Sequence, residues 1–266
     1  MQKNSRDKHR TKQNKNPKIE KEKRIKKYKI IKLIIKLFIF IALLTGLVVY
    51  AFTSPIFNIS EINILGNEKF EKEEYLNLSQ LNIGENIFNF RKSTVISNIK
   101  TNGYVESVKV KRKLPTKIEI IIEERTPTFL VALEDGTFAY INNQGYILEK
   151  SEIKLPLAII TGISTKTENI IEGNRLENDD LEKLQNVIQI KDSINNIEIS
   201  EDLSKIDITS KSNYILTFEQ EAKEVYLGDV SNLSSKILYM KCVLEEQKEI
   251  PGIIYLNQEQ VYFSPK

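Results

Sequence analysis

The sequence predicts an α+β protein with one transmembrane helix followed by two folded domains outside the membrane. A stretch without any charged side chain runs from Leu37 to Ser60, which is the pattern of a membrane span. A strongly basic segment precedes it and indicates how the span is oriented. The rest of the chain alternates strand-like and helix-like patterns separated by turn signals.

The transmembrane helix is predicted at residues 30–53. Lys32 and Lys36 lie in its first turns and can extend toward lipid headgroups. The apolar residues that remain, about 20, suffice to cross a hydrocarbon core of about 30 Å. A cleaved signal peptide and a buried core helix are the alternatives. Against cleavage, Tyr50 and Phe52 stand where a signal peptide would need small residues.

Residues 1–29 are predicted to form a disordered tail in the cytoplasm. They hold 13 Lys or Arg against 3 Asp or Glu, a net charge of +10, and offer little apolar surface to offset the entropy of ordering. Such a basic flank stays inside and directs the carboxyl-terminal side outward. We interpret the charge as a topology and lipid signal rather than as a nucleic-acid arm, because each basic residue near anionic lipid gains about 1 kcal/mol.

The first folded domain is predicted to follow the order strand, helix, helix, strand, strand. Residues 60–65 alternate in polarity before a Gly-Asn turn, which indicates a half-buried strand. Two short helices are expected within 68–81 and 91–102, and Gly103 is expected to end the second in a left-handed conformation. Two strands joined by a tight turn complete the sheet. With both helices on one face, the buried strand residues are expected to be Ile62, Ile64, Val108, Val110, Ile118, Ile120 and Ile122.

A basic run from Lys109 to Lys113 lies on one of these strands. It alternates with apolar residues, and the acidic Glu119 and Glu123 fall on the neighbouring strand. This pattern predicts a solvated face with cross-strand pairs. A protein-partner surface and a nucleic-acid patch are the alternatives.

The second domain is predicted to be mainly β with two helices. Asp135-Gly136 and Gln144-Gly145 lie between apolar runs, which indicates successive hairpins. One helix is expected from Asp179 to about Lys191, with Asn178 as its cap, and another from Asn232 to about Glu246. The segment LPLAIITG at 155–162 precedes a polar stretch up to Asp180 that suits a surface loop. Strands are expected at 197–199, 205–208, 214–218 and 224–227, and two more after Pro251-Gly252.

The sequence lacks the residues of common catalytic and metal sites. The one histidine, His9, lies in the tail, which excludes histidine-based catalysis and Cys/His zinc sites in the exported part. The one cysteine, Cys242, follows a helical pattern and is expected to be a small core residue. The pairs Glu123-Glu124 and Asp179-Asp180 are interpreted as solvated structural carboxylates. Phosphate-binding and dinucleotide motifs are missing, so we expect no catalytic residue, cofactor, metal, nucleic acid or small-molecule substrate.

Five segments carry a family resemblance through their order and spacing: ISEINILGNEKF, LNIGENIF, VESVKVKRKLPTKIEIIIEERTP, LPLAIITG and VYLGDVSNLSSKILYMKCVL. Together they resemble the bacterial cell-division protein family DivIB/FtsQ, over the chain from about Leu33 to the end. The resemblance implies a POTRA domain at residues 57–125 and a β domain at residues 126–266, behind the tail and the membrane helix.

The resemblance also implies a non-enzymatic scaffold of the division machinery. Such a protein is a single-pass type II protein of the cell membrane at the division septum. It binds DivIC/FtsB-like and FtsL-like partners and supports septum formation and septal peptidoglycan synthesis. The rival interpretations are a POTRA-type chaperone of protein export and an anchored cell-wall enzyme or sensor.

In that family the last strands of the β domain are a main docking edge for DivIC/FtsB, and the matching segment here runs from Gly252 to Pro265. A terminal strand offers unpaired backbone groups to a partner strand. Tyr262 and Phe263 are candidate anchors because aromatic residues dominate interface energies, and the alternative is that both pack inward. The expected partner-binding residues are Tyr255, where the family often has Asp, Asn257 and Gln258, where some members have Arg-Tyr, and Val261, Tyr262 and Phe263.

Overall fold

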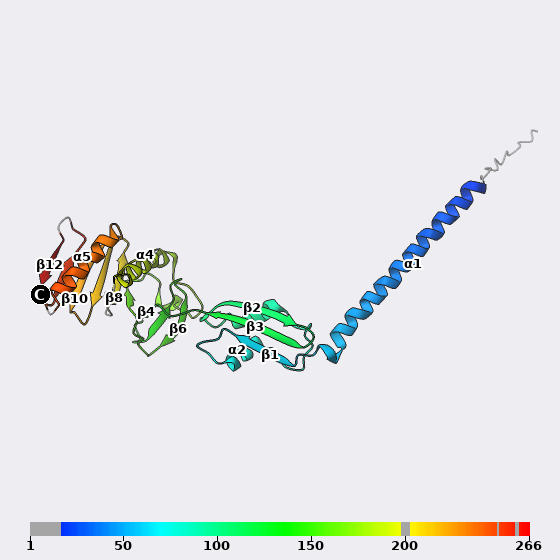
Figure 1. Cartoon of the computed structure of the whole chain (residues 1–266), viewed down its shortest axis with the longest axis horizontal. Helices are drawn as coiled ribbons and strands as arrows, with labels where there is room; N and C mark the ends of the chain where they lie inside the picture. The colour runs from blue at the N-terminus through cyan, green and yellow to red at the C-terminus, as the bar shows by residue number, and fades with distance from the viewer. Residues whose placement is uncertain (1–16, 198–202, 249, 259–260) are drawn as a thin grey trace, which may run out of the picture.

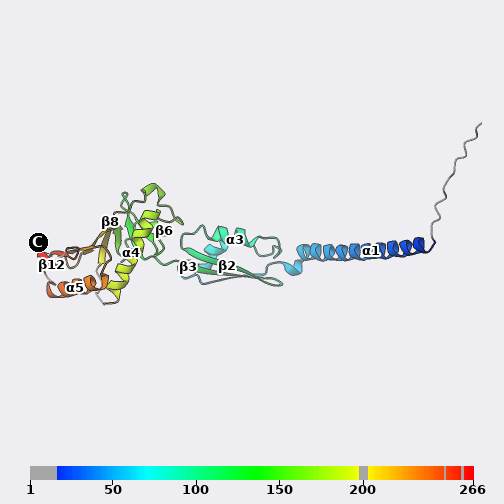
Figure 2. The same ribbon diagram turned by 90° about the horizontal axis from the view of Figure 1, so that it is seen from above.

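The computed structural model describes residues 17–197, 203–248, 250–258 and 261–266. Its parts follow one another in chain order: a long helix, a small domain from η1 to β3, and a larger domain from β4 to β12 (Figures 1 and 2). In Figure 1 the helix leaves the small domain at an angle to the line of the two domains. The carboxyl terminus lies at the end farthest from the helix. The predicted α+β class is confirmed.

The first helix, α1 (Pro17–Thr53), is longer than predicted. Residues 17–29, which were expected to be disordered, are helical, while residues 1–16 lie outside the described part of the chain. Proline is well suited to a first helical position, and the Lys, Glu and Arg residues that follow are strong helix formers. Its stretch from Arg24 to Thr53 is long and apolar enough to cross a membrane.

The first domain has the predicted strand and helix order. Its sheet runs β1-β3-β2, with β1 parallel and β2 antiparallel to the central strand β3. Helix α2 packs against α3, and Figure 2 shows α3 over one face of the sheet. The elements are η1 (Pro55–Phe57), β1 (Glu61–Leu65), α2 (Lys72–Ser79), α3 (Lys92–Ile99), β2 (Val105–Lys113) and β3 (Lys117–Glu124).

Burial in this domain follows the alternation of the strands, with two differences. Ile62 is only partly buried, whereas Ile64 on the same strand is buried, and Tyr75 of α2 is a fully buried core residue that the sequence did not single out. The basic run of β2 is solvated only in part. Lys111 pairs with Glu119 as predicted, at 3.3 Å, but the Arg112 guanidinium donates hydrogen bonds to main-chain carbonyl oxygens of the loop before α3.

The second domain is built on one long sheet. Within the described residues its strand order is β12-β11-β10-β9-β8-β7-β4-β5-β6, and Figure 2 shows α4 and α5 along the same side of it. The elements are β4 (Phe129–Ala132), β5 (Phe138–Ile141), β6 (Ile147–Ser151), β7 (Ile159–Thr161), η2 (Thr167–Asn169), α4 (Asn178–Asn195), β8 (Leu203–Ser210), β9 (Asn213–Phe218), β10 (Lys223–Gly228), α5 (Leu233–Glu246), β11 (Gly252–Tyr255) and β12 (Tyr262–Pro265).

Three local expectations for this domain are corrected. Asn178 is the first helical residue of α4, and the cap position is Glu177. Ile197 lies in a turn after α4 rather than in a strand, and residues 198–199 of that expected strand lie outside the described residues. Cys242 is exposed. It lies two residues from the buried Met240, which places it on the opposite side of the helix.

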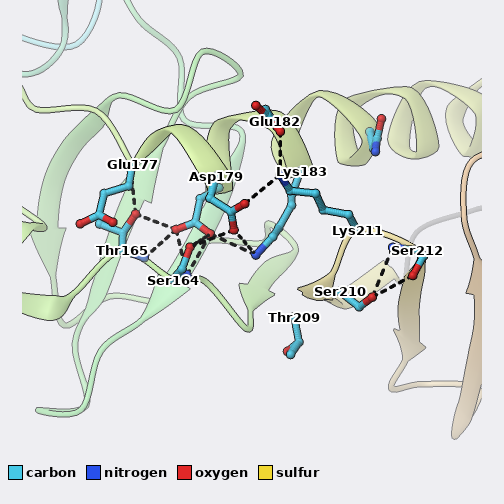
Figure 3. A network of polar contacts seen from close by, with 12 residues as sticks. Ser164, Thr165, Glu177, Asp179, Glu182, Lys183, Thr209, Ser210, Lys211 and Ser212 are labelled. Atoms are coloured by element: carbon cyan, nitrogen blue, oxygen red, sulfur yellow. Dashed lines mark hydrogen bonds and ion pairs between the residues drawn. The ribbon is translucent and has the colours of Figure 1, made fainter.

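A buried polar network fastens the start of α4 to the rest of the domain (Figure 3). Asp180 is fully buried and accepts hydrogen bonds from the N–H groups and hydroxyls of Ser164 and Thr165, at 2.6–2.9 Å. Lys211, from the turn between β8 and β9, reaches Asp179 at 2.8 Å. Asp180 is therefore structural, as expected of this pair, but it is not solvated.

Candidate partner-binding edge

The last two strands lie at one end of the long sheet. β11 pairs in parallel with β10 and antiparallel with β12, in the register Ile254↔Phe263 and Tyr255↔Tyr262. Among the described strands, β12 has β11 as its one neighbour. Its other side is therefore a sheet edge.

One face of this edge is closed by the core. Ile254 is fully buried, and Phe263 packs against the same hydrophobic cluster, which includes Met240 of α5. Gly252 is required beside it, because a Cβ there would lie 2.5 Å from the Phe263 ring. The Phe263 side chain thus packs inward, which was the alternative to a partner contact, and it attaches β12 to the core.

The opposite face carries a ladder of three tyrosines, Tyr226, Tyr255 and Tyr262, one from each of β10, β11 and β12. The Tyr226 and Tyr255 ring centroids are 5.3 Å apart, and those of Tyr255 and Tyr262 are 4.8 Å apart, with interplanar angles of 25° and 26°. Tyr262 ends the ladder at the sheet edge and is 42% exposed. Stacked rings of this kind form a rigid, largely apolar surface.

The backbone of β12 presents alternate residues to the open side. The Lys266 N–H donates to the Pro251 carbonyl oxygen at 2.9 Å, which directs the backbone of residue 266 toward β11. Antiparallel strands alternate in this respect, so the polar backbone groups of Phe263 and Pro265 face outward. Pro265 has no N–H to leave unpaired there. The open edge thus offers the Phe263 N–H and the carbonyl oxygens of both residues.

The remaining expected residues lie in the connection between β11 and β12. Asn257 is exposed, and its side-chain amide donates to Asn213 Oδ1 at 3.2 Å at the start of β9. Gln258 and Val261 are also exposed. The Tyr239 hydroxyl of α5 donates to the Val261 carbonyl oxygen at 3.3 Å. The structure thus brings Tyr255 and Tyr262 together on one face, and leaves Asn257 and Gln258 at the turn.

Sequence reasoning missed Tyr226 and Lys223 of β10. Tyr226 alternates with the buried Val225 and Leu227, so its outward direction could have been predicted, but its pairing with β11 could not. Lys223 is buried, and its ammonium donates to the Lys248 carbonyl oxygen at 3.2 Å and to Glu221 Oε2 at 3.3 Å. These bonds tie the segment after α5 to the start of β10, next to β11.

Comparison with known proteins agrees with the resemblance. The family model "POTRA domain, FtsQ-type" matches residues 57–125. The cell division protein DivIB of Clostridium tetani is 32% identical over 218 residues, which cover 80% of this chain and 79% of that protein. DivIB of Clostridium botulinum (strain Hall) is 42% identical over 130 residues, 48% of this chain and 50% of the relative. The cell division protein FtsQ of Syntrophotalea carbinolica is 24% identical over 208 residues, 76% and 71% of the two chains. This chain belongs to the DivIB/FtsQ family of cell division proteins.

Proposed function

We propose that this protein is a non-enzymatic scaffold of the bacterial divisome. Helix α1 anchors it in the cell membrane with the basic amino terminus in the cytoplasm, and the POTRA and β domains face outward at the septum. There it binds DivIC/FtsB-like and FtsL-like partners and so supports septal peptidoglycan synthesis. The family membership and the apolar helix behind a segment of net charge +10 support this role.

The observation that carries the binding proposal is the open edge of β12. A strand of a DivIC/FtsB-like partner can add to it by accepting from the Phe263 N–H and donating to the outward carbonyl oxygens. The exposed ring of Tyr262 then supplies apolar contact area on the free face. The Phe263 side chain holds β12 on the core, while the N–H of the same residue faces the partner.

The test is a truncation that lacks Gln260 to Lys266, compared with the full chain in co-purification with the DivIC-like partner. We expect the truncated chain to lose the partner, because β12 and its open backbone groups are removed. Its POTRA domain should stay folded, since the core of that domain contains no residue of β12. Undiminished capture of the partner by the truncated chain would refute the docking edge.

A further inference from the structure

The end of α1 is fastened directly to the POTRA domain. The Asn86 side-chain amide donates to the Ala51 carbonyl oxygen at 2.9 Å and thereby caps the last turn of the helix. Asn86 is itself buried, and its Oδ1 accepts from the Phe88 N–H at 3.0 Å. The cap is therefore part of the folded domain and not a passing contact.

The segment after α1 is equally well tied. The Ile59 N–H donates to the Glu85 carbonyl oxygen and the Ile87 N–H to that of Phe57, both at 2.8 Å. The Phe88 ring lies 5.7 Å from the ring of Phe52 and 5.3 Å from that of Phe57. The loop of residues 82–90 is thus joined to both sides of the point where the helix ends.

The position of Tyr50 shows at which depth of a bilayer crossed by α1 the loop of residues 82–90 contacts the end of the helix. Tyr28 and Tyr50 are about 33 Å apart at about 1.5 Å per residue, which is the spacing of two interfacial aromatic belts. Lys29, Lys32 and Lys36 lie between them in the inner turns of the helix, from which they can extend toward the headgroups. Ala51, which Asn86 caps, follows Tyr50 directly. The loop of residues 82–90 therefore reaches the level of the outer headgroups.

Apolar side chains project from the segments at this end of the domain. Ile56 of η1 is 58% exposed, Ile83 is 68% exposed and Leu114, in the turn between β2 and β3, is 59% exposed. The Ser60 N–H donates to the Thr116 carbonyl oxygen at 2.9 Å, which brings that turn to the start of β1. Figure 1 shows the same end of the β2–β3 hairpin beside the end of α1.

The charge of this end suits an anionic lipid surface. The segments 54–61, 82–92 and 111–119 together hold six basic and three acidic side chains. Basic residues near an anionic leaflet are attracted to it, and apolar side chains beside them can enter the boundary between headgroups and acyl chains. The three apolar residues stand on three separate segments, which favours insertion between lipids over one continuous protein contact.

We propose that this end of the POTRA domain, defined by Ile56, Ile83 and Leu114, docks on the outer surface of the bilayer that α1 crosses, with an anionic lipid surface as its partner. This inference rests on the proposed membrane anchor and adds a second, peripheral contact to it. The domain then has a fixed tilt relative to the membrane, and the β12 edge at the far end of the molecule is held away from the lipid (Figure 1).

The chain contains no tryptophan, so a single introduced Trp reports one position. The full chain is reconstituted in vesicles of equal parts phosphatidylcholine and phosphatidylglycerol, with or without brominated acyl chains that quench nearby indole. We expect Ile83→Trp and Leu114→Trp to show blue-shifted emission and several-fold stronger quenching than Ile153→Trp. Ile153 is the matched control, because it is also 68% exposed but lies beyond β6 in the second domain.

A fourth variant, Phe40→Trp within α1, separates the two levels of the proposal. The lipid docking is overturned, and the membrane anchor is kept, if Phe40→Trp is strongly quenched while Ile83→Trp and Leu114→Trp are quenched no more than Ile153→Trp. That result is expected if a protein covers this end of the POTRA domain instead. Absence of quenching at position 40 overturns the anchor and the docking together. Circular dichroism of each variant checks that the fold is unchanged.

Discussion

Asp180 shows how one buried charge can organise a loop. Burial alone would raise the pKa of this carboxyl, but hydrogen bonds from Thr165 and Ser164 outweigh that effect and hold its pKa below the usual 3.8. The ammonium of Lys183, a buried residue, lies 3.6 Å from Asp180 and 2.9 Å from Asp179. The loop after β7 is therefore attached to α4 through a carboxylate whose hydrogen-bonding capacity is filled.

Replacing Asp180 by Ala should be one of the more costly changes in the β domain. It leaves the Ser164 and Thr165 N–H groups without their acceptor and removes one partner of the buried Lys183. We expect the free energy of unfolding to fall by about 2–4 kcal/mol. Urea unfolding of the detergent-solubilised chain, followed by circular dichroism, measures this. Asp179→Ala is the neighbouring control, expected to cost less because its side chain is half exposed. Equal costs for the two variants would contradict the role assigned to Asp180.

The stability of the domain should also depend on acid pH. Hydrogen bonds from Lys211 and Lys183 lower the pKa of Asp179 from 3.8 to about 2. A carboxyl with a lowered pKa in the folded state stabilises the fold above its unfolded pKa, and the contribution is lost as the pH falls through the folded value. We therefore expect stability to decrease between about pH 4 and pH 2, and Asp179→Asn to flatten that slope. The free energy of unfolding is measured for the native chain and the Asp179→Asn variant at several pH values in this range. If it depends on pH equally in both, Asp179 makes no such contribution.

At the scale of elements, the β12 edge combines an open backbone with a tyrosine ladder. Tyr226 and Tyr262 are the two end residues of the tyrosine ladder, but only Tyr262 borders the open edge of β12. Neighbouring strands are about 4.8 Å apart, so Tyr226 stands nearly 10 Å further from a strand added at β12. The ladder therefore offers two chemically similar residues at different distances from the proposed partner.

Substituting these two tyrosines one at a time should show whether the partner contacts Tyr262 directly or whether the ladder only stabilises the sheet. Tyr262→Ala removes an anchor at the edge, and we expect the affinity for the DivIC-like partner to fall at least about tenfold, which corresponds to about 1.4 kcal/mol. Tyr226→Ala should change it by less than about threefold. Titration of the reconstituted full chain with the purified partner provides the comparison. If the two variants weaken binding equally, the partner does not dock along β12.

Elements with strong local periodicity were the predictable ones. The alternation in β3 and the spacing of Ile237, Met240 and Leu244 in α5 identified both elements and their buried faces, because such patterns follow from the geometry of one segment. The partners of β10 depend on contacts between distant segments, so the tyrosine ladder could not be predicted. The burial of Asp180 depends likewise on a loop that folds back over α4. In β12, the alternation of the strand could have assigned Phe263 and Tyr262 to opposite faces of the sheet. It could not have shown which of the two faces packs on the core.

At the scale of the whole molecule, the contact between the POTRA and β domains decides whether they move as one body. Gly103 lies between them: its φ is not positive, contrary to the expected left-handed cap, and a Cβ there would collide with the Leu148 carbonyl oxygen of β6. Lys69 pairs with Glu149 across the same junction. The Arg125 guanidinium donates to the Gly103 and Val105 carbonyl oxygens at 2.8 and 2.6 Å and stacks on the Tyr146 ring at 3.8 Å. Close packing at Gly103 and the position of Arg125 indicate a stiff joint.

Stiffness at this junction can be measured because Cys242 is exposed and is the one cysteine of the chain. A second spin label at Lys92→Cys, on the exposed start of α3, gives a distance between the two domains by pulsed electron paramagnetic resonance. We expect one narrow distance distribution for the otherwise native chain. Gly103→Val should displace or broaden it, because the new side chain forces the two backbones apart, and Arg125→Ala should broaden it by removing the bridge to Tyr146. Lys117→Ala, which breaks an ion pair with Glu61 at the opposite end of the POTRA domain, should leave the distance distribution unchanged.

A broad distance distribution in the native chain would mean that the two domains are hinged. The lipid-facing end of the POTRA domain could then not fix the direction in which the β12 edge points.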